Sequence, residues 1–202
     1  MQAKAEAKAK ALSAPEAVEM DVFEAIEARR SVRDFEQKKI REAEIQKILG
    51  AAVRAPSAKH VLPWRFVVIE DQAKLKELSG FVLEKYGAGK EFAARIAFLR
   101  GKTIFHDAPL VVLIACDEAA SRWVKEDAAL AAENAFLAAR ALGIGSCFIG
   151  MANKLNESEE ILAGLGLKRG MKVFAVLAFG FPKGGKWPEG ERREVKVVKR
   201  FK

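Results

Sequence analysis

The chain has 202 residues, enough for one domain or at most two small ones. Half of the residues are hydrophobic and 31% are charged, a composition that excludes a disordered or fibrous protein. The net charge is +8, and residues 183–202 contribute +5 of it, from eight Lys or Arg against three Glu. This basic segment favours a phosphate-bearing partner, either a nucleotide cofactor or nucleic acid, although a solvated tail accounts for the charge equally well.

The composition also bears on location. No apolar run is long enough to span a membrane, and the N-terminus lacks the apolar stretch of a secretory signal. Cys116 and Cys147 both stand among apolar neighbours, which favours buried thiols in a reducing compartment over the alternative of a disulfide. We therefore expect a cytoplasmic protein that does not associate with a membrane.

The N-terminal third is predicted to be mainly helical. Residues 1–20 are expected to be a flexible or helical extension, because they begin with a run of Ala, Lys and Glu that has no apolar stripe. The rest, residues 21–202, is expected to form a single domain. A helix over residues 21–29, capped by Asp21, has Val22, Phe23 and Ile26 on one face. A second helix over residues 41–54 has an apolar inner stripe, formed by Ile45, Ile48, Leu49 and Ala52.

Pro56 ends the second helix, and residues 56–63 form a loop before a strand over residues 64–70. Residues 72–79 are predicted to be helical, and so, with a weaker pattern, is the region 81–105. The apolar run at residues 109–116 predicts a central strand, preceded by a turn at His106 and Asp107.

A long, Ala-rich helix is predicted over residues 123–142, ending at Gly143. The segment GIGSCFIG (143–150) then indicates a glycine-punctuated turn that runs into a short strand. A short helix over residues 157–165 and a buried strand over residues 173–181 follow. This order predicts a three-layer α+β or α/β fold, in which some strands could pair in parallel and the strand order is undetermined.

The segment RRSVR is the first candidate site. Arg29, Arg30, Ser31 and Arg33 fall where a helix gives way to extended chain, so Ser31 and Arg33 point to the same side. Guanidinium groups with a hydroxyl suit a phosphate. The alternative is a solvated basic patch.

The loop APSAKHVLPW is the second candidate. Pro56 and Pro63 stiffen it, and Ser57, Lys59 and His60 provide polar groups that suit a flat polar ligand. The alternative is an ordinary connection between a helix and a strand. With one other histidine in the chain, His60 is not expected to belong to a metal site.

Three further features have weaker signals. GIGSCFIG lacks the spacing of a dinucleotide fingerprint, so it indicates close backbone approach to a flat group, or tight packing at a helix end. Arg192 and Arg193 could close on a phosphate or remain solvated. Asp127 and Glu133, in the long helix, are expected to be structural or solvent-facing.

Taken in order, five segments resemble the FMN-dependent nitroreductase family over roughly residues 23–193. They are EARRSVRDF, APSAKHVLPWRFVVIE, DAPLVVLIACD, ENAFLAARALGIGSCFIGM and FAVLAFGFP. The resemblance implies a three-layer α+β fold with a central mixed or antiparallel sheet flanked by helices. It also implies an entwined homodimer with two FMN sites at its interface.

Residue roles follow from the resemblance by motif. Arg29 and Ser31, with Arg30 beside them, would bind the FMN phosphate, and Arg33 would face the N1–O2 edge of the flavin, where negative charge builds up on reduction. The partner chain would supply Pro56, Ser57 and Ala58, with His60 near the cofactor. Ile149 and Gly150 would place a backbone N–H near flavin N5, and Arg192 or Arg193 would complete the phosphate site. No residue is expected to act as a nucleophile.

Two positions depart from the family's loop pattern, because His60 and Leu62 stand where Asn and Gln are usual. The departure leaves FMN binding in place but puts the substrate class in doubt. The implied reaction passes hydride from NAD(P)H through the flavin to a nitroaromatic, quinone or similar small acceptor. The alternatives are reductive dehalogenation or flavin breakdown on the same fold, and a basic module that binds nucleic acid; we expect no nucleic-acid partner.

Overall fold

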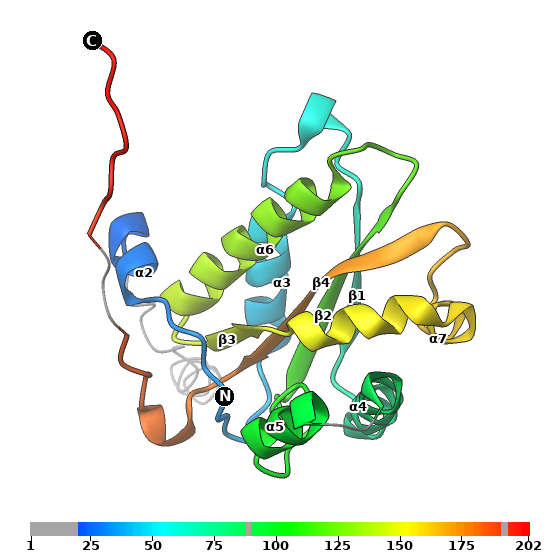
Figure 1. The fold of residues 1–202 in the computed structure, drawn as a ribbon. Helices are drawn as coiled ribbons and strands as arrows, with labels where there is room; N and C mark the ends of the chain where they lie inside the picture. The colour runs from blue at the N-terminus through cyan, green and yellow to red at the C-terminus, as the bar shows by residue number, and fades with distance from the viewer. Residues whose placement is uncertain (1–19, 88–89, 191–193) are drawn as a thin grey trace, which may run out of the picture.

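A four-stranded sheet forms the middle of the molecule (Figure 1). The computed structural model describes residues 20–87, 90–190 and 194–202, so most of the predicted extension (1–20), Arg192 and Arg193 lie outside the described residues. The strands are β1 (Trp64–Ile69), β2 (Leu110–Asp117), β3 (Gly145–Phe148) and β4 (Met171–Gly180). The α-helices are α2 (Val22–Ala28), α3 (Glu42–Ala52), α4 (Gln72–Tyr86), α5 (Lys90–Leu99), α6 (Val124–Ala141) and α7 (Glu159–Gly164). Short 3₁₀ helices are η2 (Ala58–His60), η3 (Gly150–Glu157) and η4 (Lys183–Gly185).

The strand order is β1-β2-β4-β3, and each neighbouring pair is antiparallel. The predicted strands are confirmed within one or two residues at each end, and β2 is central as expected. Parallel pairing, which the sequence left open, is limited among the described residues to one isolated bridge between Ser31 and Ser146.

Strand β2 shows how the three layers arise. Leu110, Val112 and Ile114 belong to the core beneath α3 and α6. Val111 and Leu113 belong to the core beneath α4 and η3. Successive side chains of a strand point to opposite faces, so a continuous apolar strand serves both cores at once. The predicted three-layer α+β fold is therefore confirmed.

Helix α3 has the predicted inner stripe, with Ile45, Ile48 and Ala52 buried and Leu49 partly buried. Helix α2 differs. Its only buried residue is Ala25, whereas Val22, Phe23 and Ile26 are 57%, 78% and 54% exposed. The apolar face that the sequence predicts is therefore present, but it does not pack into this chain's core.

The predicted boundaries between residues 72 and 105 are wrong. Helix α4 does not stop at residue 79 but continues through Gly80 to Tyr86. A glycine costs only about 1 kcal/mol in a helix interior, which the buried residues of α4 outweigh. The second helical segment, α5, ends at Leu99, because Arg100 and Gly101 both take left-handed conformations.

Helix α6 is confirmed, and Gly143 (φ 72°) turns the chain so that the Ile144 N–H reaches the Ala139 carbonyl (2.8 Å). Both cysteines are unpaired and buried, as expected. Burial, with a smaller effect of the Asp127 carboxylate, raises the pKa of Cys116 to about 12. In the part of the chain that the structure describes, no helix has the length and hydrophobicity needed to cross a membrane.

Candidate functional site

The predicted basic segment begins where α2 ends. Asp21 caps α2 by accepting hydrogen bonds from the N–H groups of Phe23 (2.7 Å) and Glu24 (2.9 Å). At the other end Arg29 has an extended backbone (ψ 133°), and Ser31 then bridges to Ser146 of β3. The Val32 N–H donates to the Ser146 carbonyl (2.9 Å). The segment is therefore fixed along the edge of the sheet.

Close packing of Val32 on Gly145 orients the segment. A Cβ atom on Gly145 would lie 2.7 Å from Val32 Cγ2, so only glycine lets β3 and the segment after α2 approach this closely. Val32 is 2% exposed, and its two neighbours Ser31 and Arg33 face away from the core. They share one side, as the sequence predicts.

The three arginines have different partners. Arg29 lies 3.6 Å from the Glu133 carboxylate and over the Phe136 ring (5.9 Å). Arg30 donates to the carbonyls of Glu27 and Arg29 (both 2.7 Å), so its guanidinium is engaged by nearby backbone. The Arg33 guanidinium lies 5.7 Å from the Phe98 ring centre and 3.5 Å from the Ser31 carbonyl.

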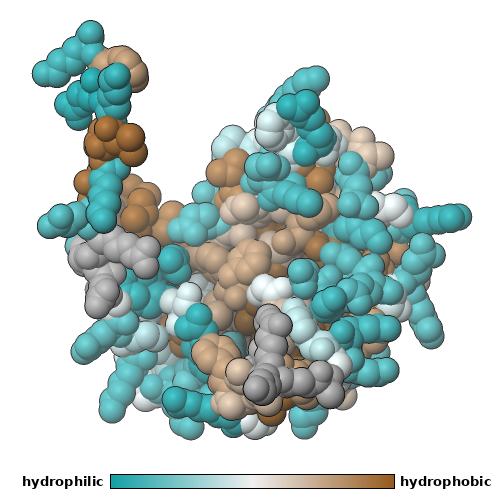
Figure 2. All heavy atoms as spheres, in the orientation of Figure 1, coloured by the Kyte–Doolittle hydropathy of each residue, from teal (hydrophilic) through white to brown (hydrophobic). Residues whose placement is uncertain are grey.

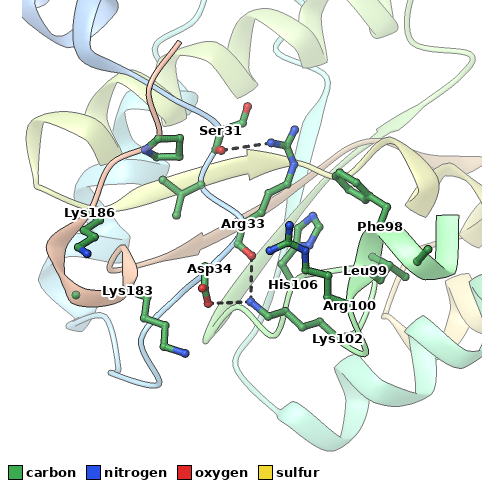
Figure 3. A pocket seen from close by; sticks show the side chains of 14 residues that line it. Ser31, Arg33, Asp34, Phe98, Leu99, Arg100, Lys102, His106, Lys183 and Lys186 are labelled. Atoms are coloured by element: carbon green, nitrogen blue, oxygen red, sulfur yellow. Dashed lines mark hydrogen bonds and ion pairs between the residues drawn. The ribbon is translucent and has the colours of Figure 1, made fainter. Parts of the chain in front are cut away.

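Arg33 lies in a cleft of about 910 Å³ (Figure 3). Three segments line the cleft: the chain after α2, the end of α5 with the following turn, and the segment around η4. Their lining residues are Ser31, Val32, Arg33, Asp34, Ala97, Phe98, Leu99, Arg100, Lys102, His106, Lys183, Gly184, Lys186 and Pro188. Five of these are Lys or Arg and one is a carboxylate, so the cleft is strongly cationic.

Two lining groups have shifted pKa values. The Lys102 ammonium donates a hydrogen bond to Asp34 (2.8 Å), which lowers the pKa of that carboxyl. Burial, with the charges of Arg33 and Lys102, lowers the pKa of His106 to about 4. His106 is therefore a neutral imidazole at pH 7, packed edge-on against Phe98 (6.0 Å between ring centres).

The end of β3 supplies backbone groups. The Ile149 N–H donates to the Val176 carbonyl (2.8 Å), so the sheet already uses it. Gly150 is the first residue of η3, a position whose N–H has no acceptor within its own helix. Cys147 belongs to the same strand, and burial raises the pKa of its thiol, whereas the nearby Arg33 opposes that rise.

The predicted loop lies at the other end of α6. The Ala58 N–H donates to the buried Asp127 carboxylate (2.9 Å) in the first turns of α6, whereas Arg140, near the end of α6, donates to the Ala28 carbonyl (3.3 Å). Arg140 follows Asp127 by 13 positions, which corresponds to about 20 Å of helix. Figure 1 shows η2 far from the chain that follows α2. One chain therefore does not bring Pro56, Ser57, Ala58 or His60 to the arginine segment.

The loop has a constrained backbone. Lys59, His60 and Leu62 all have positive φ (53°, 57° and 48°), which is uncommon for residues other than glycine. The Ser57 hydroxyl accepts a hydrogen bond from the Leu62 N–H (2.9 Å) and, with Asp127, holds this shape. Asp127 is 2% exposed, so its predicted structural role fits a buried position and not a solvent-facing one.

Sequence reasoning missed most of the cleft. Phe98, Arg100 and Lys102 lie in a region predicted only as helix, and His106 was predicted only as part of a turn. That turn is present, with positive φ at His106 and Asp107 (58° and 53°), but it also brings the imidazole into the cleft. Lys183 and Lys186 belong to the basic segment that the charge distribution singled out.

Comparisons with family models, curated proteins and solved structures all identify nitroreductases as similar to this chain. Residues 26–181 match the model of the family described as "Nitroreductase family". A relative from Archaeoglobus fulgidus, named as an NADH dehydrogenase/NAD(P)H nitroreductase, is 33% identical over 166 residues (80% of this chain, 85% of the relative). The Escherichia coli K12 NAD(P)H nitroreductase YdjA is 31% identical over 168 residues (81% and 89%). Among solved structures, a nitroreductase with bound FMN from Bacteroides fragilis has a TM-score of 0.79 at 29% identity, covering 89% of this chain and 99% of that one.

Proposed function

The chain belongs to the nitroreductase family, and on this premise we propose that it binds FMN and transfers hydride from NAD(P)H to a small oxidised acceptor. The observation that carries the proposal is the fixed segment Ser31–Val32–Arg33, which lies along β3 with a hydroxyl and a guanidinium directed into a cationic cleft. The structure of the Bacteroides fragilis nitroreductase contains bound FMN, which supports FMN as the cofactor of this chain.

The residues present fit a phosphorylated flavin. Arg29 forms an ion pair with the exposed Glu133 at 3.6 Å, a weak interaction that a phosphate dianion can displace. Ser31 adds a hydroxyl donor on the same segment. We propose that Arg29 and Ser31 hold the phosphate, with Arg30 shaping the backbone between them. Arg192 and Arg193 remain candidates for the same group.

Bound FMN would supply the redox chemistry, namely two-electron transfer between the nicotinamide and the acceptor. Arg33 provides a positive charge, held near the Ser31 carbonyl and the Phe98 ring, for the ring edge that becomes more negative on reduction. Gly150 presents an N–H at the end of β3, and we assign the donor toward the ring to Gly150, since the Ile149 N–H is bonded within the sheet.

We propose that a second copy completes the site. The loop carrying Pro56, Ser57, Ala58 and His60 is remote from its own chain's arginine segment, so a partner's loop would supply these residues. Exposed apolar side chains provide a surface for such a partner; they are Val22, Phe23, Ile26, Leu130 and Phe148. Figure 2 shows a continuous apolar area around α6 and β3 on the face that Figure 1 presents. We further propose that the acceptor is a small molecule such as a nitroaromatic or quinone.

The first test is an absorption spectrum of the purified protein, followed by release and identification of the chromophore. Arg33→Ala is expected to fold normally but to bind FMN about 10-fold more weakly or to be reduced by NADPH about 10-fold more slowly, since one charge-assisted interaction is lost. Anaerobic stopped-flow reduction and flavin titration measure both quantities.

The matched control is Arg169→Ala, which removes an exposed guanidinium beyond the opposite end of β4. It should keep wild-type flavin affinity and reduction rate. A colourless protein that takes up no added FMN contradicts the proposed function. Wild-type behaviour of Arg33→Ala contradicts only the role given to Arg33.

A further inference from the structure

The cationic cleft carries more positive charge than one flavin phosphate requires. That phosphate is assigned to Arg29 and Ser31, and Arg29 does not line the cleft. Arg100, Lys102, Lys183 and Lys186 remain, with Asp34 as the one carboxylate among the lining residues. In the described part of the chain, neither Arg100 nor the two lysines near η4 form a hydrogen bond or ion pair through their side chains. Asp34 interacts with Lys102, Lys183 and Arg100, but one carboxylate does not balance the cations of the cleft. The remaining like charges repel one another, so an anionic ligand would stabilise them.

The backbone places these cations on two sides of Asp34. On one side, the Lys183 N–H donates to the Asp34 carbonyl (3.0 Å), and the Gly184 N–H donates to the Glu36 carboxylate (3.2 Å). Gly184 and Gly185 both have positive φ (60° and 67°), so the chain turns tightly between Lys183 and Lys186.

On the other side, Lys102 is held by Asp34 (2.8 Å) and by the Arg33 carbonyl (3.3 Å). Figure 3 shows Lys183 and Lys186 on one side of the Arg33–Asp34 segment and Arg100 and Lys102 on the other. Cations spread in this way suit a ligand with several phosphates better than one with a single carboxylate.

We propose that Arg100, Lys102, Lys183 and Lys186 form a subsite for the phosphates of the reduced dinucleotide, and that this subsite makes NADPH the preferred donor over NADH. The inference rests on the proposed function, because it names the donor for the same flavin site. The 2′-phosphate adds roughly two negative charges at neutral pH, which is the difference that the cluster recognises. Phe98, 59% exposed at the same cleft, offers an aromatic face for a planar ring of the donor.

The experiment uses the FMN-loaded protein and the double variant Lys183→Glu/Lys186→Glu. The KM for NADPH is expected to rise about 10-fold and that for NADH about threefold, because charge reversal at a cleft acts on the more highly charged ligand more strongly. Raising the salt concentration should weaken NADPH binding in the wild type more than in the variant. Lys168→Glu/Arg169→Glu makes the same change in charge at exposed residues beyond the other end of β4 and should leave both KM values unchanged.

Calorimetry with adenosine 2′,5′-bisphosphate gives a readout that does not depend on turnover. The wild type should bind it more tightly than adenosine 5′-monophosphate, and the Lys183→Glu/Lys186→Glu variant should lose that difference. Equal KM values for the two donors in an FMN-loaded, active wild type overturn this inference and leave the proposed function intact. The inference is also overturned if the Lys183→Glu/Lys186→Glu variant has a raised KM for 4-nitrobenzoate but an unchanged KM for NADPH. The cluster would then bind an anionic acceptor. Failure to take up FMN contradicts the proposed function itself.

Discussion

The His106 imidazole is 6% exposed and lies near two cations of the cleft, Arg33 and Lys102. The Lys102 ammonium donates a hydrogen bond to Asp34, so one carboxylate positions a cation of the cleft. Such roles depend on contacts between residues about 70 positions apart, which no local pattern predicts.

The pKa of His106 makes stability depend on pH. Its folded value of about 4 lies below the ordinary 6.5, so between these values the unfolded chain binds a proton that the native protein does not. Stability therefore falls as the pH drops from 6.5 towards 4, by about 3 kcal/mol if the whole shift acts on folding. Urea unfolding over this range should show a shallower loss in His106→Gln than in the wild type. Identical slopes for His106→Gln and the wild type contradict the assignment.

The contact between the segment after α2 and strand β3 determines where Ser31 and Arg33 lie. Gly145→Ala would place a methyl group 2.7 Å from Val32 Cγ2 and push the Ser31–Arg33 segment away from the sheet. We expect a loss of about 1–3 kcal/mol in stability, together with weaker FMN binding. Thermal unfolding and flavin titration measure the two effects.

Two further variants test whether the effects of Gly145→Ala arise from the close contact with Val32. Gly80→Ala adds the same methyl group inside α4, where nothing lies within 4 Å, and should stabilise the protein slightly. Val32→Gly removes the Cβ and both Cγ atoms, which would lie 2.7–3.0 Å from the new methyl group, so Gly145→Ala/Val32→Gly should recover flavin affinity relative to Gly145→Ala alone. No recovery in the double variant would show that the close approach is not what Gly145 provides.

The elements differ in how well the sequence predicts them. Strand β2 and helix α6 were predictable because an unbroken apolar run and a long Ala-rich period each allow one interpretation. The region between residues 72 and 105 was not, because Gly80 resembles a helix end but is accommodated inside α4. The strand order could not be predicted from the sequence either, since it depends on pairing between segments that are distant in the chain.

For the whole molecule, the apolar pattern of α2 predicts burial but not what buries it. Within one chain Phe23 remains 78% exposed, and the loop at residues 56–60 stays remote from the cleft. The arginine segment was predictable from its residue types and its place after a helix. The cleft as a unit was not, because it forms only when three separate segments meet.

We expect a dimer in solution, measured as the mass by light scattering with flavin bound. Phe23→Glu/Ile26→Glu should shift the mass to that of one chain and release FMN, because charged groups on an apolar interface oppose association. Val68→Glu changes an exposed aliphatic residue on β1, at the opposite edge of the sheet from β3, and should remain dimeric. A single-chain mass for the flavin-bound wild type would contradict the shared site.

The burial of both thiols has a practical consequence. Cys116 is 0% and Cys147 3% exposed, and these are the only cysteines of the chain. A maleimide reagent should therefore leave the native protein unlabelled, since it needs an accessible thiolate. A cysteine introduced at the exposed Lys168 would then be the single point for attaching a fluorophore or an electrode, away from the cleft and with no background to remove.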